Sequence, residues 1–222
     1  MSADWRASRW LAVVELGLVA AIFAADVRHM IFFSKTPLLF ALGWTSLLVR
    51  RVGWRGVGLA RPARWGPTLL AGVAAGAGME LLQDFVSQPL LTRLMGHPPD
   101  LSDFLPLVGN PGLLLAALVL AWALAAFGEE MVHRGYVLNR LIDLGPPTRA
   151  WSIACLVAGS VVFGCGHLDQ GATGMVQESL SGLLLGALYF ACGRNLAAPI
   201  VAHGVVDTLD LVLIYFGKFP NL

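Results

Sequence analysis

Four ionisable side chains follow directly after seventeen residues, 112–128, that carry no charge. They are Glu129, Glu130, His133 and Arg134, within the sequence GEEMVHRGYVLNRL. Residues four apart on a helix lie side by side, so Glu130 can pair with Arg134 while Glu129 meets His133. Glu129 would then lack a fixed cation, which makes it a candidate general base.

Two further polar pairs occur in apolar segments nearer the C-terminus. FGCGH places Phe163 and His167 one helical turn apart, and HGVVD places His203 and Asp207 on one helix face. Ionisable residues inside a membrane segment are costly to bury and are therefore candidates for function. A glutamate, two histidines and an orienting acid on three helices would form a site that can activate water.

These three polar groups resemble the motifs of the CPBP family, which comprises the type II CAAX prenyl proteases and their bacteriocin-processing relatives, also called the Abi family. The chain carries EExxxR, FxxxH and HxxxD in the order that the family uses, each on an apolar helix. The resemblance covers about residues 112–217. The matching residues are Glu129, Glu130, Arg134, Phe163, His167, His203 and Asp207.

The resemblance implies an intramembrane endopeptidase that hydrolyses a peptide bond near the membrane with a glutamate-activated water. Glu129 would take a proton from the water, and His167 would help to hold it. His203 and Asp207 would stabilise the oxyanion. These four residues are the catalytic set that the resemblance implies.

The same resemblance gives supporting roles to Glu130, Arg134 and Phe163, with Arg134 securing Glu130. Asp207 departs from the family pattern, since the better-known eukaryotic members carry asparagine at this position. An ionised aspartate cannot donate a hydrogen bond. Asp207 would therefore have to be protonated, orient a histidine or bind a metal.

The residue types leave the metal content of the site open. Glu129, His167 and His203 form a His₂Glu set of the kind that binds catalytic zinc, and a metal-free glutamate mechanism uses the same residues. The expected cofactor is accordingly none, or one divalent metal such as zinc. A di-iron centre needs two ExxH motifs, and the sequence supplies only Glu130–His133.

Composition predicts an integral membrane protein. Of the 222 residues, 57% are hydrophobic and 13% are charged, whereas about 25% are charged in an average soluble domain. No basic tract indicates nucleic-acid binding. Cys155, Cys165 and Cys192 lie in apolar stretches without CxxC spacing, which favours packing roles. The isolated acids Glu15, Glu80 and Glu178 favour structural or interfacial roles.

The predicted fold is all-α: a polytopic transmembrane helix bundle with about seven spans and the site between the later helices. Residues 1–111 would form the N-terminal helices and loops, and residues 112–217 the catalytic core, within a single membrane domain. A span needs about 20 mainly apolar residues. The candidate segments are 10–27, 30–49, 66–84, 112–133, 150–167, 174–193 and 196–217.

Arginine placement predicts the orientation of the bundle. The connection 50–64 holds five arginines and no acid, and further arginines follow the fourth and sixth segments. This pattern places the N-terminus in the cytoplasm of a bacterium, with the chain in the inner (plasma) membrane.

Helix lengths conflict with the motif set. If the fourth span ended near residue 133, Glu129 would lie at its cytoplasmic end. His167, about 17 residues into the next helix, would then be about 25 Å away in depth at 1.5 Å per residue. The two residues could share a site only if the 134–150 segment dips into the bundle or the next helix breaks.

The expected partners are the lipid bilayer and a membrane-associated protein or peptide substrate. Within the family, a bacterial member could trim anchored tails of exported proteins and recognise a tail motif instead of a prenyl group. The alternative from another class is a non-enzymatic membrane protein, either a bacteriocin-immunity factor or a transporter-like scaffold. A transporter would show internal repeats, and none is evident in the sequence.

Overall fold

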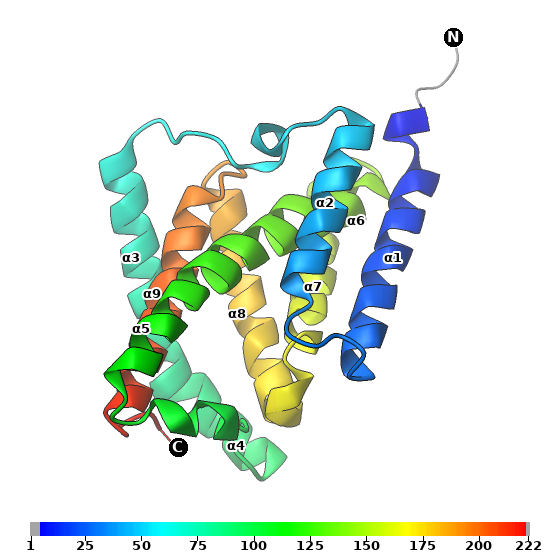
Figure 1. Cartoon of the computed structure of the whole chain (residues 1–222). Coiled ribbons are helices and arrows are strands. Elements are labelled where there is room, and N and C mark those ends of the chain that lie inside the picture. The colour runs from blue at the N-terminus through cyan, green and yellow to red at the C-terminus, as the bar shows by residue number, and fades with distance from the viewer. Residues whose placement is uncertain (1–4, 221–222) are drawn as a thin grey trace.

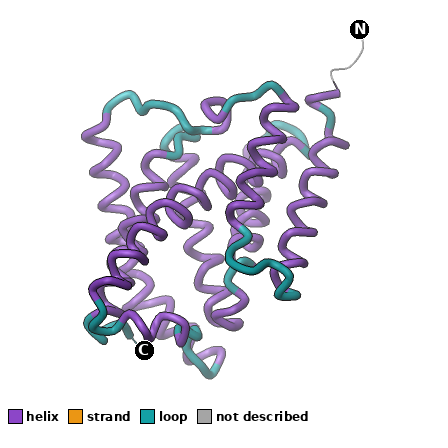
Figure 2. The backbone as a smooth tube through the Cα atoms, viewed as in Figure 1, coloured by secondary structure: helices purple, strands orange, loops and turns teal. Residues whose placement is uncertain are grey.

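The computed structural model describes residues 5–220, and all regular structure in this range is helical (Figures 1 and 2). This confirms the predicted all-α membrane bundle. The α-helices are α1 (Arg9–Val27), α2 (Thr36–Arg50), α3 (Trp65–Leu82), α4 (Gln88–Met95), α5 (Pro111–Leu120), α6 (Leu138–Asp143), α7 (Arg149–Cys165), α8 (Gly171–Ala191) and α9 (Ala197–Tyr215).

Shorter helical turns connect or extend these helices. Three π-helical stretches continue an α-helix without a break: η3 (Gln83–Ser87), η5 (Ala121–Glu129) and η6 (Met131–Val137). The 3₁₀ turns are η1 (Trp5–Ala7), η2 (Trp54–Val57), η4 (Ser102–Leu107) and η7 (Leu168–Gln170). π-helical turns are rare and occur frequently at functional sites.

All seven predicted segments are helical, but fewer than seven qualify as membrane spans. Within residues 5–220, four helices are long and apolar enough: Arg9–Val27, Trp65–Met95, Pro111–Asp143 and Ala197–Tyr215. A fifth span results if α7 and the η7–α8 helix, which meet at a bend of 66°, are counted together. Helix α2 has 15 residues, so its length of about 22 Å falls short of a hydrocarbon core of about 30 Å.

The helix that carries the two adjacent glutamates is longer than predicted. It runs unbroken for 33 residues, from Pro111 to Asp143, through α5, η5, η6 and α6. At 1.5 Å per residue it is about 50 Å long, so it fits a bilayer only when tilted. Figure 1 shows it as the green helix that crosses the bundle diagonally.

The predicted end of this helix near residue 133 is therefore wrong. Arg134 and Arg140, whose charges suggested that the helix ends before them, are buried inside the bundle. Each has an acidic partner: Arg134 pairs with Glu130 at 2.6 Å, and Arg140 pairs with Asp143 at 3.0 Å. Because the helix continues past Arg134, Glu129 lies within it, and the depth conflict disappears.

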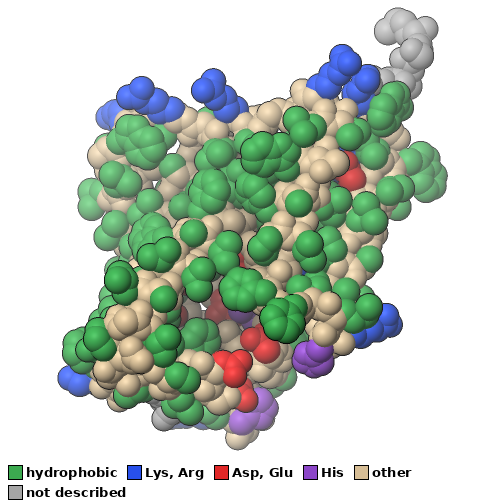
Figure 3. Space-filling view, viewed as in Figure 1, with side chains coloured by type: hydrophobic (Ala, Val, Ile, Leu, Met, Phe, Trp, Pro, Cys, Tyr) green, Lys and Arg blue, Asp and Glu red, His purple; other side chains and the backbone are tan. Residues whose placement is uncertain are grey.

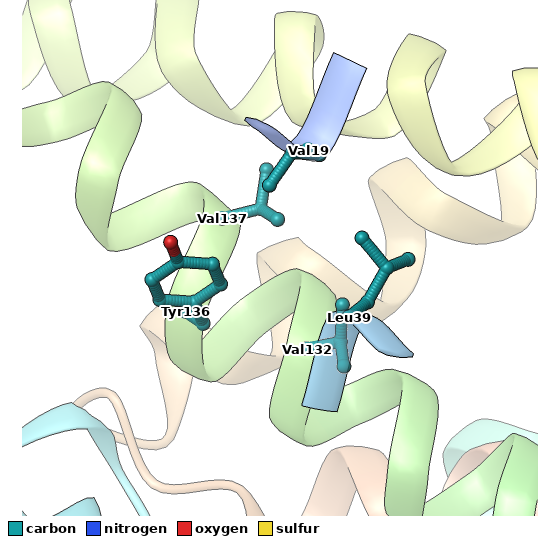
Figure 4. Close-up of a cluster of buried hydrophobic side chains, with 5 residues drawn as sticks. All are labelled: Val19, Leu39, Val132, Tyr136 and Val137. Carbon is teal, nitrogen blue, oxygen red and sulfur yellow. The ribbon is translucent and has the colours of Figure 1, made fainter. Parts of the chain in front are cut away.

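One apolar cluster packs the first two helices onto the long helix (Figure 4). It joins Val19 of α1 and Leu39 of α2 to Val132, Tyr136 and Val137 of the long helix, all nearly inaccessible to solvent. Inside a bilayer such side chains stabilise the bundle through close van der Waals packing between helices. The N-terminal helices thus hold the segment next to the glutamates in place.

A second feature fixes helix α9, which carries His203 and Asp207. Gly72 and Gly76 of α3 face α9 so closely that a Cβ on Gly76 would lie 2.5 Å from the carbonyl oxygen of Ala202. Small residues let helices approach in this way in membranes. The register of α9 against α3 therefore depends on glycine.

Candidate active site

Three separate segments bring the predicted catalytic residues to one cavity of about 810 Å³. Glu129 is the last residue of η5, His167 follows the C-terminal end of α7, and His203 and Asp207 lie one turn apart on α9. All four line the cavity. The π-helical turns around Glu129 widen the long helix at the point where it faces α9.

Glu130 does not line the cavity and is fully buried. Its Oε1 atom lies 2.6 Å from Nη1 of Arg134 and 3.0 Å from Nδ1 of His203. Arg134 also donates a hydrogen bond from Nη2 to the carbonyl oxygen of Gly182 in α8, at 3.1 Å. The ion pair predicted from the i,i+4 spacing is present, and it ties the long helix to both α8 and α9.

His203 lies between two carboxylates. Glu130 contacts its Nδ1, and Asp207 Oδ1 lies 3.6 Å from its Nε2. Opposite charges on both sides suit a protonated imidazole, in which both nitrogens carry hydrogen. The Nε2–H group is directed toward the cavity side of α9, where Asp207 is. The contact with Glu130 was not foreseen, because spacing along one helix says nothing about a partner 73 residues away.

Glu129 is half-buried and has no ion-pair partner among residues 5–220. Its Oε1 is 3.4 Å from the hydroxyl of Thr36, a long hydrogen bond. The adjacent glutamates therefore differ sharply: Glu130 is neutralised and enclosed, and Glu129 faces open space. Thr36 begins α2, outside the segment that resembles the family, and no feature of the sequence indicated its position here.

Phe163 is buried among the charged groups and separates them. Its ring centroid lies 5.1 Å from that of His167 and 6.0 Å from that of His203, and the guanidinium of Arg134 lies over it at 4.5 Å. A guanidinium over an aromatic face is attracted by the ring quadrupole. Phe163 thus supports Arg134 and limits how the two histidines can move.

His167 is oriented by its own helix. Its Nδ1 lies 3.2 Å from the carbonyl oxygen of Phe163, which favours hydrogen on Nδ1 and leaves Nε2 as an acceptor. The loop behind it is held by Lys35, whose Nζ donates to the carbonyl oxygen of Gly166 at 2.8 Å and pairs with Asp26 at 2.9 Å. A residue of the N-terminal segment therefore positions a residue of the candidate catalytic core.

The donor atoms do not form a metal site in this arrangement. In the part of the chain from Trp5 to Pro220, no three His, Cys, Asp or Glu side chains are grouped so that they could hold a metal ion. Both ring nitrogens of His203 face carboxylates instead of a shared centre with Glu129 and His167. The His₂Glu set of Glu129, His167 and His203 is therefore not arranged to hold a zinc ion, and no reaction step is assigned to a metal.

Residues 111–209 match the family model described as type II CAAX prenyl endopeptidase, Rce1-like. The matched segment contains every residue of the three motifs. The chain shows no significant similarity to a curated protein or to a solved structure.

Proposed function

Since residues 111–209 belong to the Rce1-like family of membrane proteases, we propose that this integral membrane protein is an endopeptidase in which Glu129 activates the attacking water. One observation carries the proposal: of two adjacent glutamates, one is neutralised in the protein interior and the other faces a cavity together with two histidines. A general base needs an accessible carboxylate within reach of its water.

The reaction follows from the groups that surround the cavity. Glu129 takes a proton from a water held by Nε2 of His167, and the oxygen of that water bonds to the carbonyl carbon of the peptide. The carbonyl oxygen becomes an oxyanion, which the Nε2–H group of His203 stabilises. The C–N bond then breaks, and Glu129 passes its proton to the departing amine nitrogen. The net change is hydrolysis of one peptide bond.

Glu130, Arg134 and Asp207 position these groups. Glu130 holds Nδ1 of His203, so that the other nitrogen is presented to the cavity. Arg134 balances the charge of Glu130 and anchors it to α8. Asp207 keeps the Nε2–H of His203 directed to one side of the ring until substrate arrives. This orienting role is one of the three that the sequence left open for aspartate.

The proposed substrate is a membrane-associated protein or peptide, cleaved during processing or sorting in a bacterial inner membrane with the N-terminus of the enzyme in the cytoplasm. The cavity is large enough for a peptide segment and is lined by both polar and apolar side chains. A tail motif of an anchored protein is the recognised feature that fits a bacterial member of the family.

Replacement of Glu129 tests the proposal. In a strain that lacks the chromosomal copy, proteins whose termini change on deletion should return to normal with the wild-type chain and not with Glu129→Ala. The matched control is Glu178→Ala, which removes another half-buried carboxylate that lines the same cavity. Melting curves in detergent should agree among the three proteins. Full processing by Glu129→Ala would refute the peptidase mechanism and favour a non-enzymatic membrane protein.

A further inference from the structure

The connecting segments that line the cavity belong to one end of the bundle. Besides the helices, the cavity is lined by residues of the segments 26–35, 99–104 and 165–170 and by Phe219. These segments lie together at the lower end of the bundle in Figures 1 and 2. The connections at the opposite end, 51–64, 144–148 and 192–196, contribute no lining residue.

The two ends differ in charge. In the described part of the chain, nine arginines lie in the connections and helix ends at the closed end, besides the Arg140–Asp143 pair at the end of α6; this end forms the upper edge of Figure 3. They are Arg6, Arg9, Arg50, Arg51, Arg55, Arg61, Arg64, Arg149 and Arg194.

At the open end, basic and acidic side chains are balanced. This end holds Arg28, Lys35, Arg93 and Lys218 together with Asp26, Asp100, Asp103 and Asp169. In Figure 3, red and purple side chains lie inside and beside a hollow in the lower part of this face.

Connections rich in arginine remain in the cytoplasm. We infer that the closed, arginine-rich end is cytoplasmic and that the catalytic cavity opens to the outer side of the membrane. The substrate is then an exported protein with a membrane-proximal segment, reached from outside and not from the cytoplasm. This assignment of substrate class rests on the proposed peptidase function, whereas the side of the opening does not.

The depth of the site agrees with a membrane-proximal substrate. Asp207 and His203 precede the end of α9 at Tyr215 by eight and twelve residues, which places them about 12 and 18 Å below it along the helix. A hydrocarbon core is about 30 Å thick, so the scissile bond must reach roughly to its middle. A soluble loop held above the surface would not reach the site, but an extended segment next to a membrane anchor would.

The wall of the cavity offers a path for such a segment. Ala117, Ala121 and Ala125 of the long helix line the cavity together with Leu120 and Leu124, and the loop between α1 and α2 adds Phe33 and Ser34 to the lining. The three alanines leave room for a peptide backbone beside the apolar leucine side chains. The substrate can therefore approach along the long helix while its anchor stays in lipid.

Cysteine labelling in intact cells tests the side of the opening. The three native cysteines are replaced by alanine, and two variants then carry one cysteine each, Ser102→Cys at the open end and Ala63→Cys at the closed end. Both positions are exposed. A membrane-impermeant maleimide is added to bacterial cells whose outer membrane has been permeabilised. We expect labelling of Ser102→Cys in intact cells, and of Ala63→Cys only after the inner membrane is lysed.

Labelling of Ala63→Cys with protection of Ser102→Cys would overturn the inference, and so would equal labelling of both before lysis. Labelling of both after lysis is the control for thiol reactivity. Because labelling needs no catalysis, it is repeated in a Glu129→Ala background, where the result should be the same. If the protein is not a peptidase, the labelling pattern stays the same, so the two hypotheses can fail independently.

The substrate class has its own readout. Protein termini are compared between cells that carry the wild-type chain and cells that carry Glu129→Ala. We expect the changed termini to belong to exported proteins and to lie next to a hydrophobic segment. Changed termini confined to cytoplasmic proteins would overturn the assignment of the substrate, even if Glu129 proves essential.

Discussion

Two of the clusters of charged side chains inside this bundle differ in what surrounds them. The first joins Glu15 of α1 to Arg50 of α2, with Nη2 to Oε2 at 2.8 Å, and Ser46 donates a hydrogen bond to the same carboxylate at 2.6 Å. None of these three residues lines the cavity. The second is the group around Glu129 and Glu130, where one carboxylate is paired and the other faces open space.

The comparison separates structural from functional charge in a membrane protein. In the Glu15 cluster each carboxylate oxygen has a donor, as the structural role predicted for Glu15 requires. In the Glu129 cluster neither glutamate is satisfied in this way: Glu130 is paired through Oε1 while its buried Oε2 has no hydrogen-bond partner in the described residues, and Glu129 has only a long contact with Thr36. A buried charge without a cation is costly, and Glu129, which has none, lies where the interior opens to the cavity. The cavity, and not the presence of charge, marks the active site.

The largest expected effect distinguishes the two carboxylates directly. Glu129→Gln should lower the rate of peptide hydrolysis about 10²–10⁴-fold, the usual contribution of a general base, with no loss of melting temperature. Glu15→Gln should do the reverse, because it leaves Arg50 buried with weaker partners. Rates per folded molecule and detergent melting curves check both. A stable Glu15→Gln protein with low activity would erase the distinction.

Removal of the arginine from either cluster should lower the melting temperature of the protein. Arg134→Ala and Arg50→Ala each remove the arginine closest to a buried carboxylate, and breaking a buried ion pair costs about 3–5 kcal/mol. Both should lower the melting temperature more than Glu129→Ala does. Arg134→Ala should also slow hydrolysis in the remaining folded protein, since Glu130 orients His203. Equal melting temperatures for Arg134→Ala and Glu129→Ala would argue against a structural role for the Glu130–Arg134 pair.

A glycine substitution should move the catalytic helix without touching either cluster. Gly76→Ala places a methyl group 2.5 Å from the carbonyl oxygen of Ala202, next to His203. Overpacking of this kind costs about 1–3 kcal/mol. Gly78→Ala is the matched control, because its Cβ would meet nothing within 4 Å. Thermal melting should separate the two variants, and equal stability would show that α9 shifts freely against α3.

The smallest effect is expected at Asp207. Asp207 Oδ1 lies 3.6 Å from Nε2 of His203, too far for a hydrogen bond, and in Asp207→Asn, Glu130 still holds the other ring nitrogen, so we expect a loss of about tenfold. This is the lower end of the range seen when groups that orient a histidine are altered. Hydrolysis of a peptide substrate is measured for both proteins. A loss beyond a thousandfold would show that the negative charge of Asp207 acts in the reaction itself.

The sequence by itself determined the helical class, the membrane location and the similarity of residues 111–209 to the Rce1-like family model. Apolar composition and segment length decide the first two, and motif spacing decides the third, because each depends on neighbours along the chain. The i,i+4 pair of Glu130 and Arg134 was predictable for the same reason.

Only the tertiary structure decided where charged residues are buried and which of them meet. The helix end expected near residue 133 is absent because Arg134 and Arg140 find acidic partners inside the bundle, and pairing removes the cost that would otherwise end an apolar helix there. Likewise the contacts of His203 with Glu130, of Thr36 with Glu129 and of Lys35 with Gly166 join residues 73, 93 and 131 positions apart. Such contacts depend on how helices pack, and no local pattern encodes them.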